Sequence, residues 1–197
     1  AGSPIEGGVF TSATAGSFDV SATYMEFTSE VVTVTFTPSI SFTKRVLIED
    51  YTGTWCGYCP RVSRGIELVK EATDKAVVAA IHRGNDPYNF EAQALENMIN
   101  LQGYPTAMLN RKTDWTYPEP ANVNQVVNLT TGTKPKVGLA MTSTVSGGNI
   151  NLEVKTKFGT DFASAKLVVY VLENGLAASL KLRLVIKVIS FIRRMIS

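Results

Sequence analysis

The chain has 197 residues, of which 45% are apolar, and a formal net charge of +2. This apolar content excludes a disordered chain, and so small a charge gives no sign of nucleic-acid binding or electrostatic membrane binding. No run reaches the roughly 18 apolar residues of a membrane-spanning helix, and two cysteines are too few for a disulfide scaffold.

The first forty residues alternate apolar with polar side chains, as strands with one buried face do. One alternating run covers residues 18–24 and a second covers residues 32–36, with Pro38 after it. We therefore expect an N-terminal β segment over residues 1–43.

Residues 44–132 differ, because apolar strands here alternate with helical patterns. Residues 46–48 are continuously apolar, as in a strand covered on both faces, and Pro60 suits the first turn of a following helix. A second apolar strand covers residues 77–81. Alternation of this kind predicts an α/β layer architecture.

The second half of this region carries two further helices and a short strand. Asn89 can cap the first of these helices and Gly103 can end it. A strand over residues 106–109 has residues 115–117 as its expected partner, and Pro120 opens a short helix. The apolar face expected for the Asn89 helix comprises Phe90, Ala94, Met98 and Ile99 or Leu101.

From Lys134 the pattern is again that of strands. Alternating runs flank the turn signal Gly147-Gly148-Asn149, which predicts a hairpin, and residues 167–172 form a further strand. We expect an all-β, sandwich-like portion over residues 133–175. Two arrangements remain open: the terminal β segments share one sandwich, or each packs separately on the middle region.

Residues 176–197 are an atypical basic tail with five basic residues and no acidic ones. Alternation over residues 180–186 is compatible with an edge strand. The abrupt loss of acidic residues also fits a shifted reading frame, and we prefer this second interpretation. In neither case does the charge indicate a nucleic-acid or membrane ligand.

Both cysteines lie in the motif Cys56-Gly57-Tyr58-Cys59, at the expected start of a helix. Thiols at this spacing share one face and are close enough for a disulfide. The unpaired amides and the positive dipole end of the helix would lower the pKa of Cys56 and make it a nucleophile. Cys59, expected one turn into the helix, would resolve the mixed disulfide. The motif therefore predicts thiol–disulfide exchange.

Two other interpretations of the cysteine pair remain. A structural disulfide here would restrain little of the unfolded chain, because the loop it closes is short. A metal site needs about four ligands, and His82 is the sole histidine. We interpret His82 as structural. We expect no metal and no cofactor other than a redox-active Cys56–Cys59 disulfide.

The segment at 46–60, Val-Leu-Ile-Glu-Asp-Tyr-Thr-Gly-Thr-Trp-Cys-Gly-Tyr-Cys-Pro, resembles the active-site segment of the thioredoxin superfamily. Gly-Tyr-Pro-Thr at 103–106 resembles the cis-proline loop of that superfamily. The resemblance covers residues 44–132 and implies a thioredoxin-like domain, a central mixed sheet with flanking helices. It also implies that Pro105 is cis beside the sulfurs and that Tyr104 presents backbone groups to an extended substrate.

Three further residues are assigned roles beside the cysteines. Asp50 occupies the place where thioredoxins keep a buried Asp and would pass a proton during resolution. The alternatives are that Asp50 is a solvated strand-end acid or that Glu49 points inward instead. Trp55 and Tyr58 would contact the substrate, although Trp55 could equally pack beneath the loop, and Tyr58 replaces the proline of thioredoxin.

Tyr-Thr-Gly-Thr-Trp-Cys-Gly-Tyr-Cys-Pro, His-Arg-Gly-Asn-Asp at 82–86 and the β-rich extension to about Gly175 resemble the Omp28-related outer-membrane proteins of Bacteroidetes. This resemblance implies a periplasmic or outer-membrane-associated location, with a lipid anchor as the expected membrane attachment. We expect an oxidoreductase acting on protein thiols and disulfides of the envelope. The alternative is a binding or adhesin-type protein on a non-catalytic thioredoxin scaffold. Redox direction, electron partner and oligomeric state stay open.

Overall fold

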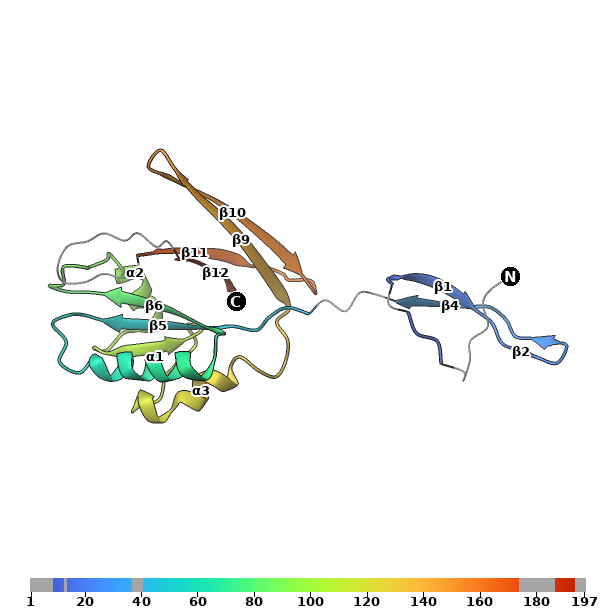
Figure 1. The fold of residues 1–197 in the computed structure, drawn as a ribbon, viewed down its shortest axis with the longest axis horizontal. Helices are drawn as coiled ribbons and strands as arrows, with labels where there is room; N and C mark the ends of the chain where they lie inside the picture. The colour runs from blue at the N-terminus through green and yellow to red at the C-terminus, as the bar shows by residue number, and fades with distance from the viewer. Residues whose placement is uncertain (1–8, 13, 37–40, 174–186, 194–197) are drawn as a thin grey trace. The chain divides into compact units, whose positions relative to one another are not determined.

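The computed structural model describes residues 9–12, 14–36, 41–173 and 187–193. The chain divides into two compact units, Ala1–Ser41 and Phe42–Ser197. It is a mixed α/β protein with mostly strands, few helices and several small sheets (Figure 1). Within the described residues, no helix is long and apolar enough to cross a membrane.

The first unit contains two small antiparallel strand pairs, in keeping with the alternating pattern, and the β2–β3 hairpin lies between the strands of the other pair. One apolar face is formed by Phe10, Phe18 and Phe36, whose rings meet edge to face with centroids 5.2 to 5.7 Å apart. Sheets of two strands have little core of their own, so these rings supply much of the packing. The paired strands are β1 (Gly16–Val20) with β4 (Val32–Phe36), and β2 (Thr23–Tyr24) with β3 (Phe27–Thr28).

A four-stranded sheet lies at the centre of the second unit, in the order β6-β5-β7-β8. All seven residues of β5 are buried, which confirms the strand expected to be covered on both faces. β6 runs parallel to β5, whereas β7 is antiparallel to β5 and β8 is antiparallel to β7. The strands are β5 (Val46–Thr52), β6 (Ala76–His82), β7 (Thr106–Leu109) and β8 (Thr113–Asp114).

Helices cover the sheet on both faces (Figure 1). α1 (Pro60–Ala72) starts at the expected proline and buries Val62 and Val69 against β5 and β7. The same face is covered by η2 (Glu119–Ala121) and α3 (Val123–Asn128), the short helix expected after Pro120. α2 (Gln93–Ile99) packs on the other face, against Tyr51 of β5.

The expected bounds of α2 were wrong. Of its expected apolar face, Phe90, Ala94 and Met98 are exposed, whereas Ile99 and Leu101 do pack against the core. The helix begins at Gln93 rather than near Asn89, and Asn100, in the left-handed conformation with φ 52°, ends it before Gly103. Phe90 lies before the helix, donates its amide to the His82 carbonyl at 3.0 Å and is 54% exposed. The inward face carries Glu96, a charged residue that finds its partner outside the helix.

A tight turn joins β7 to β8, with Asn110 and Arg111 both at φ 53°. Asn110 bonds to both the amide and the carbonyl of Leu47, so the turn is fixed to β5. The strand partner of β7 is Thr113–Asp114 rather than residues 115–117. Trp115 still donates its amide to the Ala107 carbonyl and is buried in the core.

The C-terminal strands form two antiparallel pairs. β9 (Val137–Ser146) and β10 (Asn149–Phe158) are joined by Gly147 and Gly148 at φ 57° and 76°, which confirms the predicted hairpin. β11 (Lys166–Leu172) pairs with β12 (Lys187–Arg193). The edge strand predicted over residues 180–186 lies outside the described residues.

β11 is fastened to the central sheet by a buried ionic cluster. Glu49 is fully buried on β5 and accepts hydrogen bonds from the Arg111 guanidinium and, at 2.6 Å, from the Tyr170 hydroxyl. Asp50, on the opposite face of β5, is also buried. Both acids therefore point into the protein, and Asp50 is not a solvated strand-end residue.

Candidate functional site

The cysteine pair forms a disulfide between the end of β5 and the start of α1. A turn closed by the Cys56 amide and the Gly53 carbonyl leads into it. Cys59 is the N-cap of α1 and does not lie one turn inside the helix, because the helix begins only at Pro60. Both residues are buried, with exposed fractions of 9% for Cys56 and 4% for Cys59, so Cys56 is the less buried of the two.

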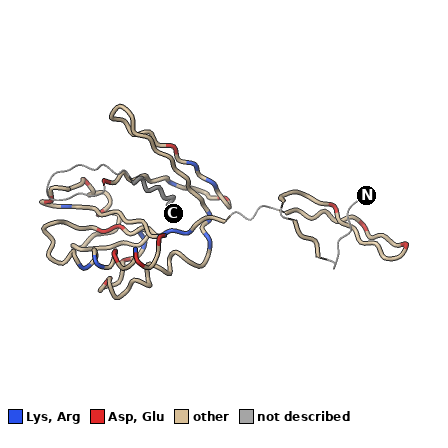
Figure 2. The backbone as a smooth tube through the Cα atoms, in the orientation of Figure 1, with Lys and Arg blue, Asp and Glu red and all other residues tan. Residues whose placement is uncertain are grey.

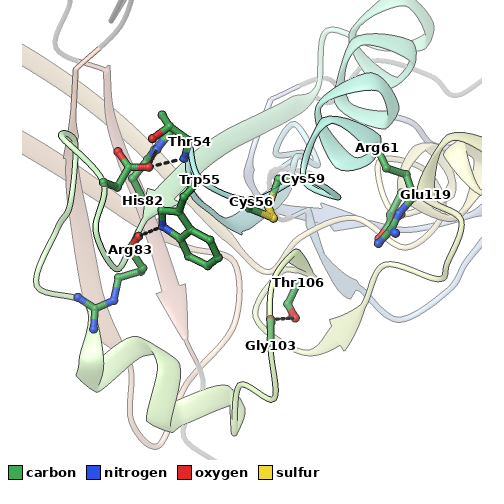
Figure 3. Close-up of a disulfide and its surroundings, with 11 residues drawn as sticks. Thr54, Trp55, Cys56, Cys59, Arg61, His82, Arg83, Gly103, Thr106 and Glu119 are labelled. Carbon is green, nitrogen blue, oxygen red and sulfur yellow. Dashed lines mark hydrogen bonds and ion pairs between the residues drawn. A yellow bond between two sulfur atoms is a disulfide. The ribbon is translucent and has the colours of Figure 1, made fainter. Parts of the chain in front are cut away.

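Trp55 and Tyr58 border the disulfide and are 49% and 77% exposed. The Trp55 indole donates a 2.6 Å hydrogen bond to the Arg83 carbonyl (Figure 3). Gly53 and Gly84 make room for the indole, since an added Cβ would lie 2.5 and 3.1 Å from its nitrogen. Trp55 is therefore both packed along one edge and accessible to a partner.

The loop that precedes β7 lies beside Trp55. Its Tyr104–Pro105 peptide bond is cis, as is the unpredicted Tyr117–Pro118 bond. The Tyr104 ring meets the Trp55 ring edge to face at 5.4 Å. Figure 3 shows the turn between Gly103 and Thr106 facing the sulfurs. The fold thus brings together the two segments singled out in the sequence, although 46 residues separate Pro105 from Cys59.

Asp50 is 3% exposed and lies on the face of β5 that packs against α1. Within the described part of the chain, its Oδ1 atom has no hydrogen-bond partner. Burial, and then the nearby charge of Glu119, raise the pKa of Asp50 to about 7. A carboxyl group with this pKa can accept and release a proton near neutral pH.

Glu119 is a buried carboxylate that the sequence interpretation missed. Arg61 donates to it from Nε at 2.5 Å and from Nη2 at 3.2 Å, and the Arg61 guanidinium also stacks 4.5 Å from the Tyr117 ring. η2 approaches α1 closely at Gly65, where an added Cβ would lie 3.2 Å from the Glu119 Cβ. The pair joins residues 58 apart, so no local pattern could have revealed it.

Asp86 fixes the loop ahead of the cysteines. It accepts the Thr54 amide at 2.5 Å and the Tyr88 amide at 2.8 Å, and it lies 3.0 Å from His82 Nδ1. Burial acts to raise the pKa of Asp86, but hydrogen bonds from His82 and from the two amides outweigh it and lower the pKa to about 2. His82 thus has a structural partner, in keeping with its interpretation.

A sequence model described as "Outer membrane protein Omp28" matches residues 92–190, half of the chain. The chain belongs to the Omp28 outer membrane protein family. This membership places the protein outside the cytoplasm, in association with the outer membrane. No curated protein gives a significant match.

The Omp28 match differs in extent from the resemblance seen in the sequence. It begins at residue 92, after the cysteine motif, and it continues past Gly175 to residue 190. Because the match includes residues 176–190, it does not favour a shifted reading frame as the origin of the basic tail. Since Cys56 and Cys59 lie outside the match, the chemistry of this Omp28-family protein has to be judged from its own geometry.

Metal coordination has no candidate in the Omp28-family chain as described. Among the residues with described side chains, no three His, Cys, Asp or Glu residues come close enough to hold an ion. The ionisable groups around the disulfide are instead paired with arginines or, for Asp50, buried without a hydrogen bond to Oδ1.

Proposed function

We propose that this Omp28-family protein is a thiol–disulfide oxidoreductase of the bacterial envelope. The observation that carries the proposal is the Cys56–Cys59 disulfide at the start of α1, with Cys56 the less buried of the two residues at 9% exposure. Asp50 is buried on the face of β5 that packs against α1. An exposed Trp55 and the Tyr104–Pro105 loop border the disulfide. Protein thiols and disulfides of the envelope are the proposed partners, and a lipid anchor is the proposed membrane attachment.

We also propose that residues 44–132 form a thioredoxin-like domain. The mixed order β6-β5-β7-β8 and the helices on both faces support this. The β9–β10 pair and β11 support a sandwich-like portion over residues 133–175, whereas β12, the partner of β11, lies in the basic tail 176–197. The N-terminal β segment covers residues 1–43. A Bacteroidetes origin rests on the resemblance of the cysteine segment.

In the proposed reaction the reduced protein transfers two electrons to a substrate disulfide. The Cys56 thiolate attacks one substrate sulfur, forms a mixed disulfide and releases the other sulfur as a thiolate. Cys59 then attacks Cys56 Sγ, restores the protein disulfide and releases the second substrate sulfur. Asp50 takes the proton from Cys59 as it attacks, and protons return to the two substrate thiolates. Tyr58 and Trp55 contact the substrate chain.

A binding or adhesin-type function is the second candidate, favoured by one observation. The β9–β10 hairpin carries exposed apolar side chains, with Val145 59%, Ile150 39% and Phe158 47% exposed. Such a face is typical of a surface that meets a partner. In this case the disulfide would be structural, and the thioredoxin-like domain would not catalyse thiol–disulfide exchange.

The reduction potential and turnover of the Cys56–Cys59 pair distinguish the two functions. An oxidoreductase is expected between about −270 mV, typical of a reductant, and about −120 mV, typical of an oxidant. A potential well below about −300 mV with no reduction of insulin would support the binding function.

Two serine variants test the assigned order of attack. Cys59→Ser is expected to accumulate a mixed disulfide when its Cys56 thiolate attacks a substrate disulfide, because the resolving sulfur is missing. Cys56→Ser is expected to trap none. Trapping by Cys56→Ser alone would reverse the two roles.

A further inference from the structure

The segment from His82 to Asp86 braces the loop that carries the nucleophilic cysteine. The Arg83 amide donates to the Thr52 carbonyl at 3.0 Å, and its carbonyl accepts the Trp55 indole at 2.6 Å. Asp86 accepts the Thr54 amide at 2.5 Å. Three separate hydrogen bonds therefore hold the chain over the four residues that precede Cys56.

The Arg83 side chain reaches in the opposite direction, to α2. Its guanidinium meets the Glu96 carboxylate twice, at 2.6 and 3.1 Å, and also donates to the Phe90 carbonyl at 2.7 Å. The Arg83 and Glu96 side chains are only 12% and 8% exposed. The mutual hydrogen bond lowers the pKa of Glu96 and raises that of Arg83, so both groups are charged.

Glu96 closes the network at the cis-proline loop. It accepts the Tyr104 hydroxyl at 2.5 Å, and the Tyr104 ring packs edge to face against Trp55. Trp55, Arg83, Glu96 and Tyr104 thus form a closed ring of contacts, which we call the aromatic clamp. The clamp joins the loop before Cys56 to the loop that holds Pro105.

A pocket of about 470 Å³ opens beside the aromatic clamp. Glu96 and Tyr104 form part of its wall, and carboxamide side chains form most of the rest. These amides can donate to and accept from a peptide backbone or polar side chain. The carboxamides are those of Gln93, Asn97, Asn100 and Gln102.

We propose that Arg83 and Glu96 are a positioning pair that holds Trp55 and Tyr104 at the spacing needed to bind a protein substrate. The inference rests on the proposed oxidoreductase function and specifies its substrate class as polypeptide disulfides. A buried ion pair contributes little net stability but can fix one arrangement among several. A small disulfide does not extend beyond the sulfurs, whereas a polypeptide on either side of its disulfide lies over Trp55 and Tyr104, whose rings are in contact.

The test compares two substrates and two variants of the full chain. Glu96→Gln removes the charge of the pair but keeps an acceptor for Tyr104. Glu67→Gln is the matched control, since Glu67 pairs with Arg64 on the exposed side of α1. The KM for insulin and the rate with oxidised glutathione are measured for the wild-type protein and both variants. Glu96→Gln is expected to raise the KM for insulin about tenfold or more, because a hydrogen bond to a charged group is lost. Any change in the rate with oxidised glutathione is expected to be much smaller.

A spectroscopic measurement separates positioning from general damage. The chain has two tryptophans, so incorporated 5-fluorotryptophan gives two ¹⁹F resonances. The Trp55 resonance is expected to shift or broaden in Glu96→Gln, whereas that of Trp115, which is 3% exposed in the core, stays in place. Glu67→Gln is expected to move neither. Tyr104→Phe, which removes one hydroxyl and no charge, gives a second, milder variant if Glu96→Gln does not fold.

The outcomes are distinguishable. If the wild-type protein exchanges with neither substrate, the proposed function falls and the positioning role falls with it. If it exchanges with both, and Glu96→Gln and Tyr104→Phe affect them equally or leave Trp55 unmoved, the positioning role is overturned while the oxidoreductase stands. A raised KM for insulin without a comparable change in the rate with oxidised glutathione, together with a shifted or broadened Trp55 resonance, supports the positioning role.

Discussion

β5 and β10 are both continuous strands of the second unit, but their surroundings differ. Every residue of β5 is buried, whereas β10 is exposed along its whole length except at Val154, which is half-buried. β5 has a strand on each side and helices over both faces, while among the described strands β10 pairs with β9 alone. The charged residues of this hairpin all lie on β10 (Figure 2). Burial therefore depends on the number of neighbouring elements more than on strand length, and most of the stability should reside in the central sheet.

The largest expected effect comes from removing apolar volume from β5. Ile48 is fully buried between α1 and the neighbouring strands. Ile48→Ala is expected to lower the free energy of unfolding by about 3–5 kcal/mol, because it removes buried methyl groups and leaves a cavity. Urea denaturation measures this change. A loss below about 1 kcal/mol would remove the distinction between the two regions.

The second effect concerns the buried acid on the same strand. The folded protein keeps Asp50 protonated up to about pH 7, whereas the unfolded chain releases the proton near its ordinary pKa of 3.8. The free energy of unfolding should therefore fall as the pH rises from about 4 to 7, by up to about 4 kcal/mol. Asp50→Asn is expected to abolish this decline and to stabilise the protein at pH 8.

Denaturation curves at pH 4 and pH 8 measure the effect of Asp50→Asn. The exposed Asp74 provides a control, and Asp74→Asn should leave the pH dependence unchanged. Equal stability of Asp50→Asn and the wild-type protein at both pH values would contradict a raised pKa.

A smaller effect is expected where β11 is fastened to the central sheet. Tyr170→Phe removes the 2.6 Å hydrogen bond to Glu49 and nothing else, so the expected loss is about 1.5–3 kcal/mol for a bond to a charged group. Thermal denaturation and hydrogen exchange of the β11 amides measure it. Tyr24→Phe, at a residue 75% exposed, should change neither. Unchanged exchange in Tyr170→Phe would mean that the strand is held by its apolar contacts alone.

The smallest effect is expected on the hairpin. Ile150→Ala makes the same chemical change as Ile48→Ala, but Ile150 is 39% exposed. The expected loss stays below about 1 kcal/mol, because little apolar surface returns to water. A loss approaching that of Ile48→Ala would show that a partner or a further layer covers the hairpin in solution.

Local patterns predicted the elements whose surroundings are simple. The apolar run at 46–48, Pro60 and the glycines of the β9–β10 turn each determine structure through their immediate neighbours, and each prediction was confirmed. The cis bond at Pro105 was predicted from a resemblance and is present. These features needed no knowledge of what the chain contacts at long range.

The charged side chains around the site could not be predicted in this way. Glu96 lies where a helical pattern calls for an apolar residue, and it is inward because Arg83 lies opposite. Glu119 and Glu49 likewise depend on arginines 58 and 62 residues away. An analysis of periodicity assigns every charged residue to the surface. It therefore predicts that both members of a buried ion pair are exposed.

The turn between β7 and β8 shows a compromise between backbone and side chain. Two successive left-handed residues usually favour glycine at the second position, yet the chain places Arg111 there. The guanidinium neutralises Glu49 in the interior, and a glycine would relax the backbone while leaving that acid without its counter-charge. Replacing this turn with a common Asn-Gly turn would therefore remove a buried positive charge. The position of the Arg111 side chain, more than the comfort of the backbone, determines which residue this turn requires.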